Sequence, residues 1–500
     1  MGEHVIQGIQ AALTLSNLGA LVAGTFVGIV VGILPGVGPM VGMVVLLPFT
    51  FAFSPDVALS LLLGVFCGGY FGGAVPAILM RTPGVPSSLI TSFDGFPLTQ
   101  KGEAQTALSA ALLGSFGGGI ISVVILIFLA PVLAHVAASF GPPEYFSAGL
   151  LGVVLVVMAY RKQLARGLLL LGLGLWFSTV GIDGTTLSAR FTFGVWSMQN
   201  GLDLVAICLG LFGIGQTLLL VERTILQATT MNLTRSTLDF SKLRSAMRHW
   251  KTLGVSGVIG TFVGLLPGTG SILASFLSYE TAKRTSRHPE TFGRGAPEGC
   301  MAAEAGNNAV PAGAMIPLLT LGIPGEALSA VLLGVFTING IYPGPLLLIK
   351  EPVLINTLYF SMILINVAAF VMLALWLRPF AMIVRVPTAL LSVSIMVISL
   401  TGIYAVNTRL FDAGVAVVMG VLGYILLRMR WPVVNLVMGV VLGEILENRL
   451  RQSLSLGDGS PMIFLTRPIS LGLILAAGLI IVIPLVVDRR RKAKAETPWP

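Results

Sequence analysis

Residues 28–38 read GIVVGILPGVG, and residues 260–270 read GTFVGLLPGTG. Both segments place two glycines four residues apart and follow them with Leu-Pro-Gly-x-Gly, so the chain contains an internal repeat. Proline removes a backbone donor and glycine weakens a helix, so each Pro-Gly pair predicts a break within an apolar helix. At membrane depth, irregular backbone persists only against protein or a water-filled cavity. The repeat therefore predicts two halves that each contain a broken or re-entrant helix.

The composition places most of the chain in a bilayer. Of its 500 residues, 55% are hydrophobic and 10% are charged, whereas soluble domains carry about 25% charged residues. Apolar runs recur along the chain, and a helix needs about 20 apolar residues to cross the hydrocarbon core. We expect an all-α, polytopic integral membrane protein with roughly 12 segments.

The net charge of +9 is explained by membrane topology. Basic residues form short clusters at the ends of apolar runs, a pattern typical of cytoplasmic loops and not of a nucleic-acid-binding face. We expect no nucleic acid, disulfide, zinc site or cofactor, because the three cysteines and four histidines are scattered. The clusters expected in the cytoplasm are Arg161–Arg166, Arg223–Lys251, Lys283–Arg294, Arg428–Arg430 and Arg489–Lys492.

The repeat and the charges together divide the chain. We predict a first transmembrane repeat at 1–221, a cytoplasmic basic linker at 222–251, a second repeat at 252–487 and a cytoplasmic basic tail at 488–500. Residues 252–279 are long enough for only one membrane crossing, but basic residues at both ends predict that both ends lie in the cytoplasm. A re-entrant or broken helix satisfies both observations. The alternative is a short loop between two helices near the membrane surface.

Each half contains a second break, at 82–88 in the first half and at 322–326 in the second. A helix interrupted at depth exposes N–H groups at one end and C=O groups at the other, so it can hold an anion and a cation. Glu304 lies in an apolar context, where an ionised carboxylate facing lipid costs several kcal/mol, so it is expected to face a cavity, a cation or a proton path. The predicted substrate- and cation-binding residues, with Na⁺ as one cation considered, are Pro35, Gly36, Gly38, Thr82, Pro83, Gly84, Ser87, Ser88, Pro267, Gly268, Gly270, Glu304, Asn307, Asn308, Pro324 and Gly325.

Three further charged residues have simpler interpretations. Arg81 ends an apolar run and is either a partner for an anionic substrate or an anchor at the membrane boundary. Asp94 and Asp458 both precede glycine and resemble ordinary turn residues.

Motifs of enzymes and ATPases are absent from the sequence, including His-Glu-x-x-His, a Walker loop and Gly-x-Ser-x-Gly. We therefore expect no enzyme, and any uphill transport must draw on an energy source other than ATP.

Several ordered motifs resemble the large membrane subunit of the tripartite tricarboxylate transporter family. They are GILPGVGP at 32–39, FGPPEYF at 140–146, LPGTG at 266–270, EAGNN at 304–308 and IPG at 323–325. The resemblance implies a secondary transporter in the bacterial inner membrane. It also implies a small membrane subunit and a periplasmic solute-binding protein that delivers carboxylates such as citrate.

Anion import into a cell with an inside-negative potential needs a driving ion. Moving one negative charge inward costs about 2.3 kcal/mol per 100 mV, so moving a tricarboxylate with three charges costs roughly 7 kcal/mol at that potential. Cotransported Na⁺ or H⁺ offsets this, and the sequence favours neither. The alternatives are a passive channel, a carboxylate transporter that works without a binding protein, and a membrane enzyme, for which the sequence offers no catalytic dyad.

Overall fold

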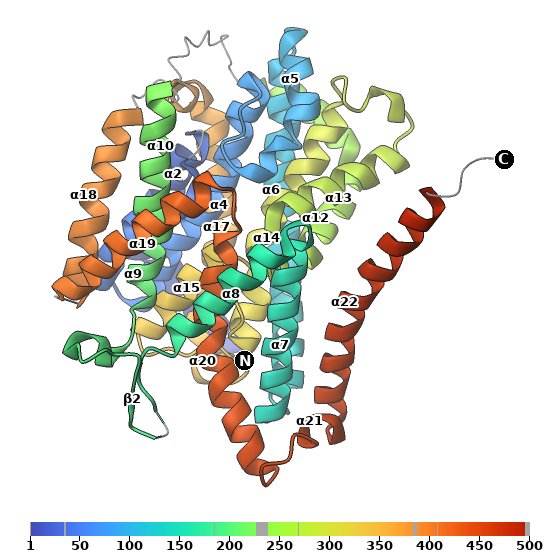
Figure 1. The fold of residues 1–500 in the computed structure, drawn as a ribbon. Coiled ribbons are helices and arrows are strands. Elements are labelled where there is room, and N and C mark those ends of the chain that lie inside the picture. The colour runs from blue at the N-terminus through green and yellow to red at the C-terminus, as the bar shows by residue number, and fades with distance from the viewer. Residues whose placement is uncertain are drawn as a thin grey trace. The chain divides into compact units, whose positions relative to one another are not determined.

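The computed structural model describes residues 2–34, 37–184, 186–226, 239–268, 270–383, 388–407 and 409–495. These residues are helical almost throughout, and the described strands form one short antiparallel pair, β1 (Gly181–Ile182) and β2 (Ala189–Arg190) (Figure 1). The structure confirms a helical protein with several membrane-spanning helices. Seven described segments are long and apolar enough to cross a bilayer: Leu15–Ile33, Pro55–Met80, Ala104–Ala137, Pro142–Ala159, Leu204–Glu222, Pro352–Phe380 and Leu410–Arg428.

The chain forms two compact units, and the first comprises Met1–Ala137 and Asp203–Arg430. Its α-helices are α1 (Gly2–Ala12), α2 (Leu15–Ile33), α3 (Gly38–Leu46), α4 (Pro55–Met80), α5 (Ser92–Gln100), α6 (Ala104–Ala137), α9 (Leu204–Cys208), α10 (Gly215–Leu226), α11 (Phe240–Ala246), α12 (Trp250–Gly264), α13 (Gly270–Thr285), α14 (Pro297–Leu321), α15 (Ala327–Ile338), α16 (Leu347–Lys350), α17 (Pro352–Ile383), α18 (Thr388–Asn407) and α19 (Leu410–Arg428). A π-helical segment, Leu209–Ile214, joins α9 to α10.

The second unit comprises Ala138–Leu202 and Trp431–Pro500. It contains the strand pair and the helices α7 (Pro142–Ala159), α8 (Leu164–Ser178), α20 (Val433–Leu456), α21 (Ile463–Thr466) and α22 (Pro468–Ala495). Within it, α20 packs against α7 and α8, and α22 packs against α7. The predicted basic tail begins inside α22, which is described as far as Ala495.

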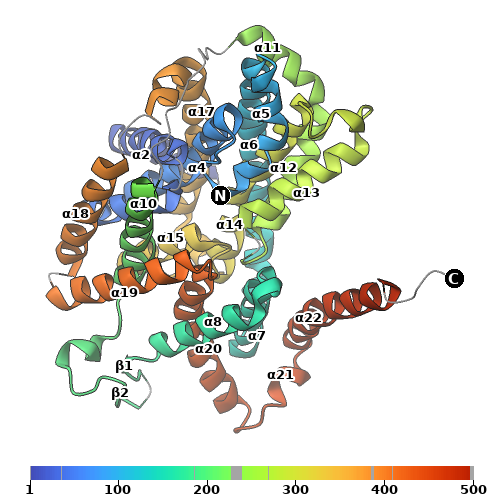
Figure 2. The same ribbon diagram turned by 45° about the horizontal axis from the view of Figure 1, so that its top comes forward.

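Helices α4 and α14 form the centre of the first unit. The apolar part of α4 is completely buried, and so is α14 from Gly299 to Thr320. Helix α2 packs against α4, while α6, α12 and α13 pack against α14 (Figure 2). Small residues allow these backbones to approach closely, which is how helices associate where lipid removes the hydrophobic driving force.

The repeated glycines make matching contacts in the two halves. At each, a methyl group in place of the hydrogen would overlap a backbone carbonyl of the neighbouring central helix, so alanine does not fit. The matching pairs are Gly28 with Val65 and Gly32 with Gly69 between α2 and α4, and Gly260 with Gly306 and Gly264 with Val310 between α12 and α14.

The predicted break at Leu266–Gly270 separates α12 from α13, which pack together as a hairpin. The Ser278 hydroxyl donates a 3.3 Å hydrogen bond to the carbonyl of Ser256, and these residues lie equally far along the chain from Pro267 in the break. The outer ends of the hairpin also meet, because Thr252 and Ser286 both donate to Glu298, at 2.5 and 2.7 Å. The basic flanks of this segment therefore lie at one end of the hairpin, which reconciles its length with its charge.

The predicted linker and domain boundaries remain predictions. Residues 227–238 of the linker lie outside the described residues, and α11 occupies part of its remainder. Glu222 at the start of the linker pairs with Arg428 at 3.0 Å, so two of the predicted cytoplasmic clusters begin at the same end of this unit.

Candidate functional site

A buried carboxylate joins the two halves of the first unit. Glu304 lies in the N-terminal third of α14 and has no solvent-exposed surface. Its Oε1 accepts hydrogen bonds from the Ser88 hydroxyl at 3.1 Å and the Thr91 hydroxyl at 2.5 Å. Both donors come from the break between α4 and α5. The first-half break therefore supplies the donors for a carboxylate of the second half.

The second oxygen of Glu304 is bound by its own helix and by α6. Oε2 accepts from the amide groups of Asn307 and Asn308, each at 3.1 Å, and from the Ser115 hydroxyl at 3.5 Å. Residues three and four positions apart share one helix face, so the Glu-x-x-Asn-Asn spacing places both amides beside the carboxylate. Asn308 also donates to Ser115 at 2.9 Å. We call these residues, with Ser88 and Thr91, the Glu304 network.

Three oxygens at the network accept no hydrogen bond. Because the amide nitrogens of Asn307 and Asn308 face the carboxylate, their Oδ1 atoms point elsewhere. Both Oδ1 atoms and the hydroxyl of Ser87 are buried, and none has a hydrogen-bond partner in the described part of the chain. A buried polar atom without a partner costs about 1–3 kcal/mol, so these atoms mark places where a ligand or ordered water would be stabilised.

The Glu304 network has no positive side chain of its own. Within the described part of the chain, no lysine, arginine or histidine forms an ion pair with Glu304, and no three His, Cys, Asp or Glu side chains cluster as metal ligands. Five neutral donors compensate part of the desolvation penalty of a buried carboxylate. Carboxylate, amide and hydroxyl oxygens are the ligands that hard cations take, so the network suits a small cation better than an anion.

The two breaks of each half contact one another. Gly84 lies against the carbonyl oxygen of Gly32, and Gly325 lies against the carbonyl of Gly264. The N–H of Gly268 also donates to the carbonyl of Gly325 at 2.8 Å. Gly268 has a φ of +78°, a conformation that glycine adopts without strain. The repeated sequence thus builds the same junction of breaks twice.

The helices that start at the breaks converge on α4. Helix α3 has no side-chain cap, and neither α3 nor α13 carries an acidic residue in its first turn. Pro39 of α3 meets Gly69 of α4, and Ser271 of α13 interacts with the hydroxyl of the next residue, Tyr70. Helix N-termini favour anions, so this region suits a carboxylate substrate.

The remaining predicted residues lie outside the Glu304 network. Thr82 is exposed and Pro83 is half-buried, whereas Pro267 and Pro324 are buried within the breaks. Gly38 and Gly270 begin α3 and α13 with φ values of +72° and +68°. Pro35 and Gly36 lie outside the described residues. Arg81 is exposed at the end of α4, 5.9 Å from the ring centre of Phe96.

The turn interpretation of Asp94 is wrong. Asp94 lies in the first turn of α5 and is fully buried. Its Oδ1 accepts from the backbone N–H groups of Gly293, Gly295 and Ala296 at 2.7, 2.8 and 2.9 Å, and its Oδ2 accepts from Tyr279 at 2.9 Å. It therefore fastens α5 to the loop that precedes α14. Asp458 lies in an exposed turn after α20, with φ of +49°, as predicted.

Sequence reasoning missed Ser115 and Tyr70. Ser115 stands in an apolar run of α6, where isolated hydroxyls are common and carry no signal. Tyr70 donates to Glu326 at 2.9 Å across 256 residues of chain, a relation that local sequence does not show.

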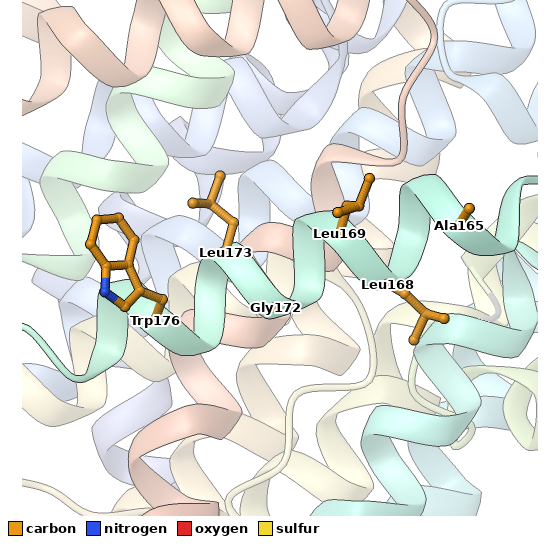
Figure 3. A pocket seen from close by; sticks show the side chains of 6 residues that line it. All are labelled: Ala165, Leu168, Leu169, Gly172, Leu173 and Trp176. Carbon is orange, nitrogen blue, oxygen red and sulfur yellow. The ribbon is translucent and has the colours of Figure 1, made fainter.

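A hollow on the second unit is lined differently from the Glu304 network. Figure 3 shows its lining along one face of α8, formed by Ala165, Leu168, Leu169, Gly172, Leu173 and Trp176. Leu169 is 63% exposed, and no charged side chain lines the hollow. Such a surface suits lipid tails or another apolar helix, so we do not assign the substrate site to it.

Together, the buried helices, the paired breaks and the internal carboxylate define a polytopic membrane protein of the transporter class. A model of the "Tripartite tricarboxylate transporter TctA family" matches residues 18–438, and the chain belongs to this family of transporters, which are not enzymes. The membership confirms the resemblance to the large membrane subunit.

Two relatives come from Agrobacterium vitis. The chain is 36% identical over 500 residues, covering 98% of both chains, to an "Uncharacterized 52.8 kDa protein in TAR-I ttuC' 3'region". It is 34% identical over 244 residues to an "Uncharacterized protein in TAR-II ttuC' 3'region", covering 47% of this chain and 99% of that protein. No solved structure matches the chain.

Proposed function

We propose that this protein imports small carboxylates, such as citrate or a related organic acid, across the bacterial inner membrane by cation coupling. A periplasmic solute-binding protein delivers the substrate, and a small membrane subunit completes the complex. Family membership supports tricarboxylate transport as the general function. The observation that carries the proposal is the Glu304 network, whose buried carboxylate joins the two halves and forms no ion pair with a described cationic side chain.

The substrate and the cation bind at different places. The anionic substrate binds at the N-termini of α3 and α13, where no acidic side chain occupies the first turn. A cation that enters with the substrate offsets the cost of moving negative charge inward, about 2.3 kcal/mol per charge per 100 mV. The matched glycine contacts support duplicated halves, whose relative motion exposes the site to each side in turn.

Reconstitution tests this proposal. The large subunit, the small subunit and the binding protein are placed in proteoliposomes, and uptake of labelled citrate and a panel of di- and tricarboxylates is followed. We expect accumulation above equilibrium that depends on the binding protein and on an imposed ion gradient. The matched control contains the complex without any gradient, in which uptake stops at equilibrium.

A passive channel predicts a different result, namely flux that ignores both Na⁺ and H⁺ gradients. Uptake that is gradient-driven but unchanged when the binding protein is omitted would instead indicate a carboxylate transporter that works alone. Either result would overturn the corresponding part of the proposal.

A further inference from the structure

Another buried carboxylate of the first unit lies at the second-half break. Glu326 is the residue before α15, and 7% of its surface is exposed. Its Oε2 accepts a 2.9 Å hydrogen bond from the Tyr70 hydroxyl. Its Oε1 is buried and has no hydrogen-bond partner among the residues that the structure describes.

Glu326 and Glu304 have opposite surroundings. Five donors surround Glu304, favour its charged form and offset part of the desolvation that burial imposes on it. Glu326 has one side-chain donor and no basic partner among the described ion pairs. A buried carboxylate so poorly compensated is more easily neutralised by a proton than kept ionised. One unpartnered oxygen suffices for a proton, whereas a metal ion requires a cage of several oxygens.

Few ionisable groups face Glu326 from the helices that pack against α15. Helix α3 carries no ionisable residue. Helix α14 contacts Gly325, the neighbour of Glu326, through Ala314. The ionisable residues of α14 lie near its N-terminus, away from Ala314. The ionisable residues on these helices are Asp56, Cys67 and Tyr70 of α4, Cys208 of α9, and Glu298, Cys300 and Glu304 of α14. Of these, Cys67 and Tyr70 interact with Glu326, and neither supplies a positive charge.

Glu326 also lies beside the region that suits the substrate. Tyr70, its donor, interacts with Ser271 in the first turn of α13, and the preceding residue, Gly69, meets Pro39 of α3. An ionised Glu326 would repel a carboxylate at these helix starts, and a protonated Glu326 would not. Proton binding and substrate binding therefore favour each other, which is the requirement for symport.

We propose that Glu326 carries the coupling proton: it binds H⁺ on Oε1 when the substrate enters and releases it on the cytoplasmic side. This inference rests on the proposed function and names its driving ion as H⁺. Tyr70 is a positioning residue that holds Oε2.

The test uses the reconstituted three-component complex with labelled citrate as the probe. For the wild type, an inward proton gradient without Na⁺ drives accumulation, and a Na⁺ gradient without a pH difference does not. Glu326→Gln lowers the ratio of internal to external citrate to one. The variant still exchanges external for internal citrate, because in exchange the carrier returns with citrate bound and no proton has to be released. Glu290→Gln, at an exposed carboxyl, keeps the wild-type ratio.

A second readout does not require transport. Infrared difference spectra between acid and alkaline pH contain a protonated-carboxyl band that Glu326→Gln removes and Glu304→Gln retains. Glu326→Ser removes the carboxyl and supplies a hydroxyl that is favoured at a helix N-cap, so it replaces Glu326→Gln if that variant does not fold.

Distinct outcomes separate the two proposals. If the wild type follows a Na⁺ gradient only, or if Glu326→Gln still accumulates citrate under a proton gradient, the proton assignment is overturned. If the wild type moves no carboxylate under any gradient, the proposed function fails. In that case the infrared band still decides whether Glu326 binds a proton, and its persistence in Glu326→Gln would reject the assignment.

Discussion

Gly84 and Gly32 are in direct backbone contact: a methyl group on Gly84 would overlap the carbonyl oxygen of Gly32. Gly325 and Gly264 repeat this relationship in the second half, where the added carbon would lie 2.7 Å from the carbonyl oxygen. The pairs hold the first break of each half against its second break.

Alanine at either second-break glycine forces these backbones apart. We expect Gly84→Ala and Gly325→Ala each to lower the free energy of unfolding by about 1–3 kcal/mol, the usual cost of overpacking. Thermal unfolding in detergent and the amount of protein in the membrane measure the effect. Gly19→Ala is the matched control, because a methyl group there meets no atom within 4 Å. Equal stability of Gly84→Ala and Gly19→Ala would show that the contact is not required.

Glu304→Gln tests the buried network. The N–H₂ group of the new amide cannot accept the hydrogen bonds that one carboxylate oxygen accepted. At least one hydrogen bond to a charged group is therefore lost. Such a bond contributes about 2 kcal/mol, close to a thirtyfold change in affinity. We expect initial citrate uptake by the reconstituted complex to fall at least about tenfold on this basis.

The control for this variant is Glu298→Gln, which alters a carboxyl on the same helix outside the Glu304 network. We expect it to keep most of the uptake. Comparable losses in both variants would assign Glu304 a general structural role.

Asp94→Ala removes the acceptor for three backbone N–H groups at once. Each buried donor left unpaired costs about 1–3 kcal/mol, so we expect a loss of roughly 3 kcal/mol or more in stability. Tyr279→Phe removes one hydrogen bond to Asp94 and is expected to lose about 1 kcal/mol. Thermal unfolding compares the two variants, and a larger loss for Tyr279→Phe would contradict the ranking.

The positions of the basic clusters predict which loops face each side of the membrane. Leu187 is 78% exposed in the excursion after α8, and α8 begins beside the basic residues Arg161 and Lys162. In intact cells, an impermeant thiol reagent is expected to label Leu187→Cys through the periplasm. Arg287→Cys, in a basic cluster, is expected to react only after the inner membrane is permeabilised.

The native cysteines Cys67, Cys208 and Cys300 are buried and free, so the unsubstituted chain is the background control. Labelling of Arg287→Cys in intact cells would place that cluster on the periplasmic side and reverse the predicted orientation.

Local rules explain which features the sequence could predict. Proline lacks an N–H and glycine tolerates positive φ wherever they occur, so the break at Leu266–Gly270 follows from five adjacent residues. The side-by-side placement of Glu304, Asn307 and Asn308 follows from helix periodicity. The composition alone requires a membrane environment.

Contacts between distant segments could not be read from the chain. Thr91 reaches Glu304 across 213 residues. Asp94 looked like a turn residue because the backbone N–H groups that donate to it lie about 200 residues later, in the loop before α14. The sequence by itself determined that this protein is a helical membrane protein with repeated breaks, because those properties depend on neighbouring residues. Only the tertiary structure decided that Glu304 accepts hydrogen bonds from several donors whereas Glu326 accepts one, because this depends on which distant helices pack together.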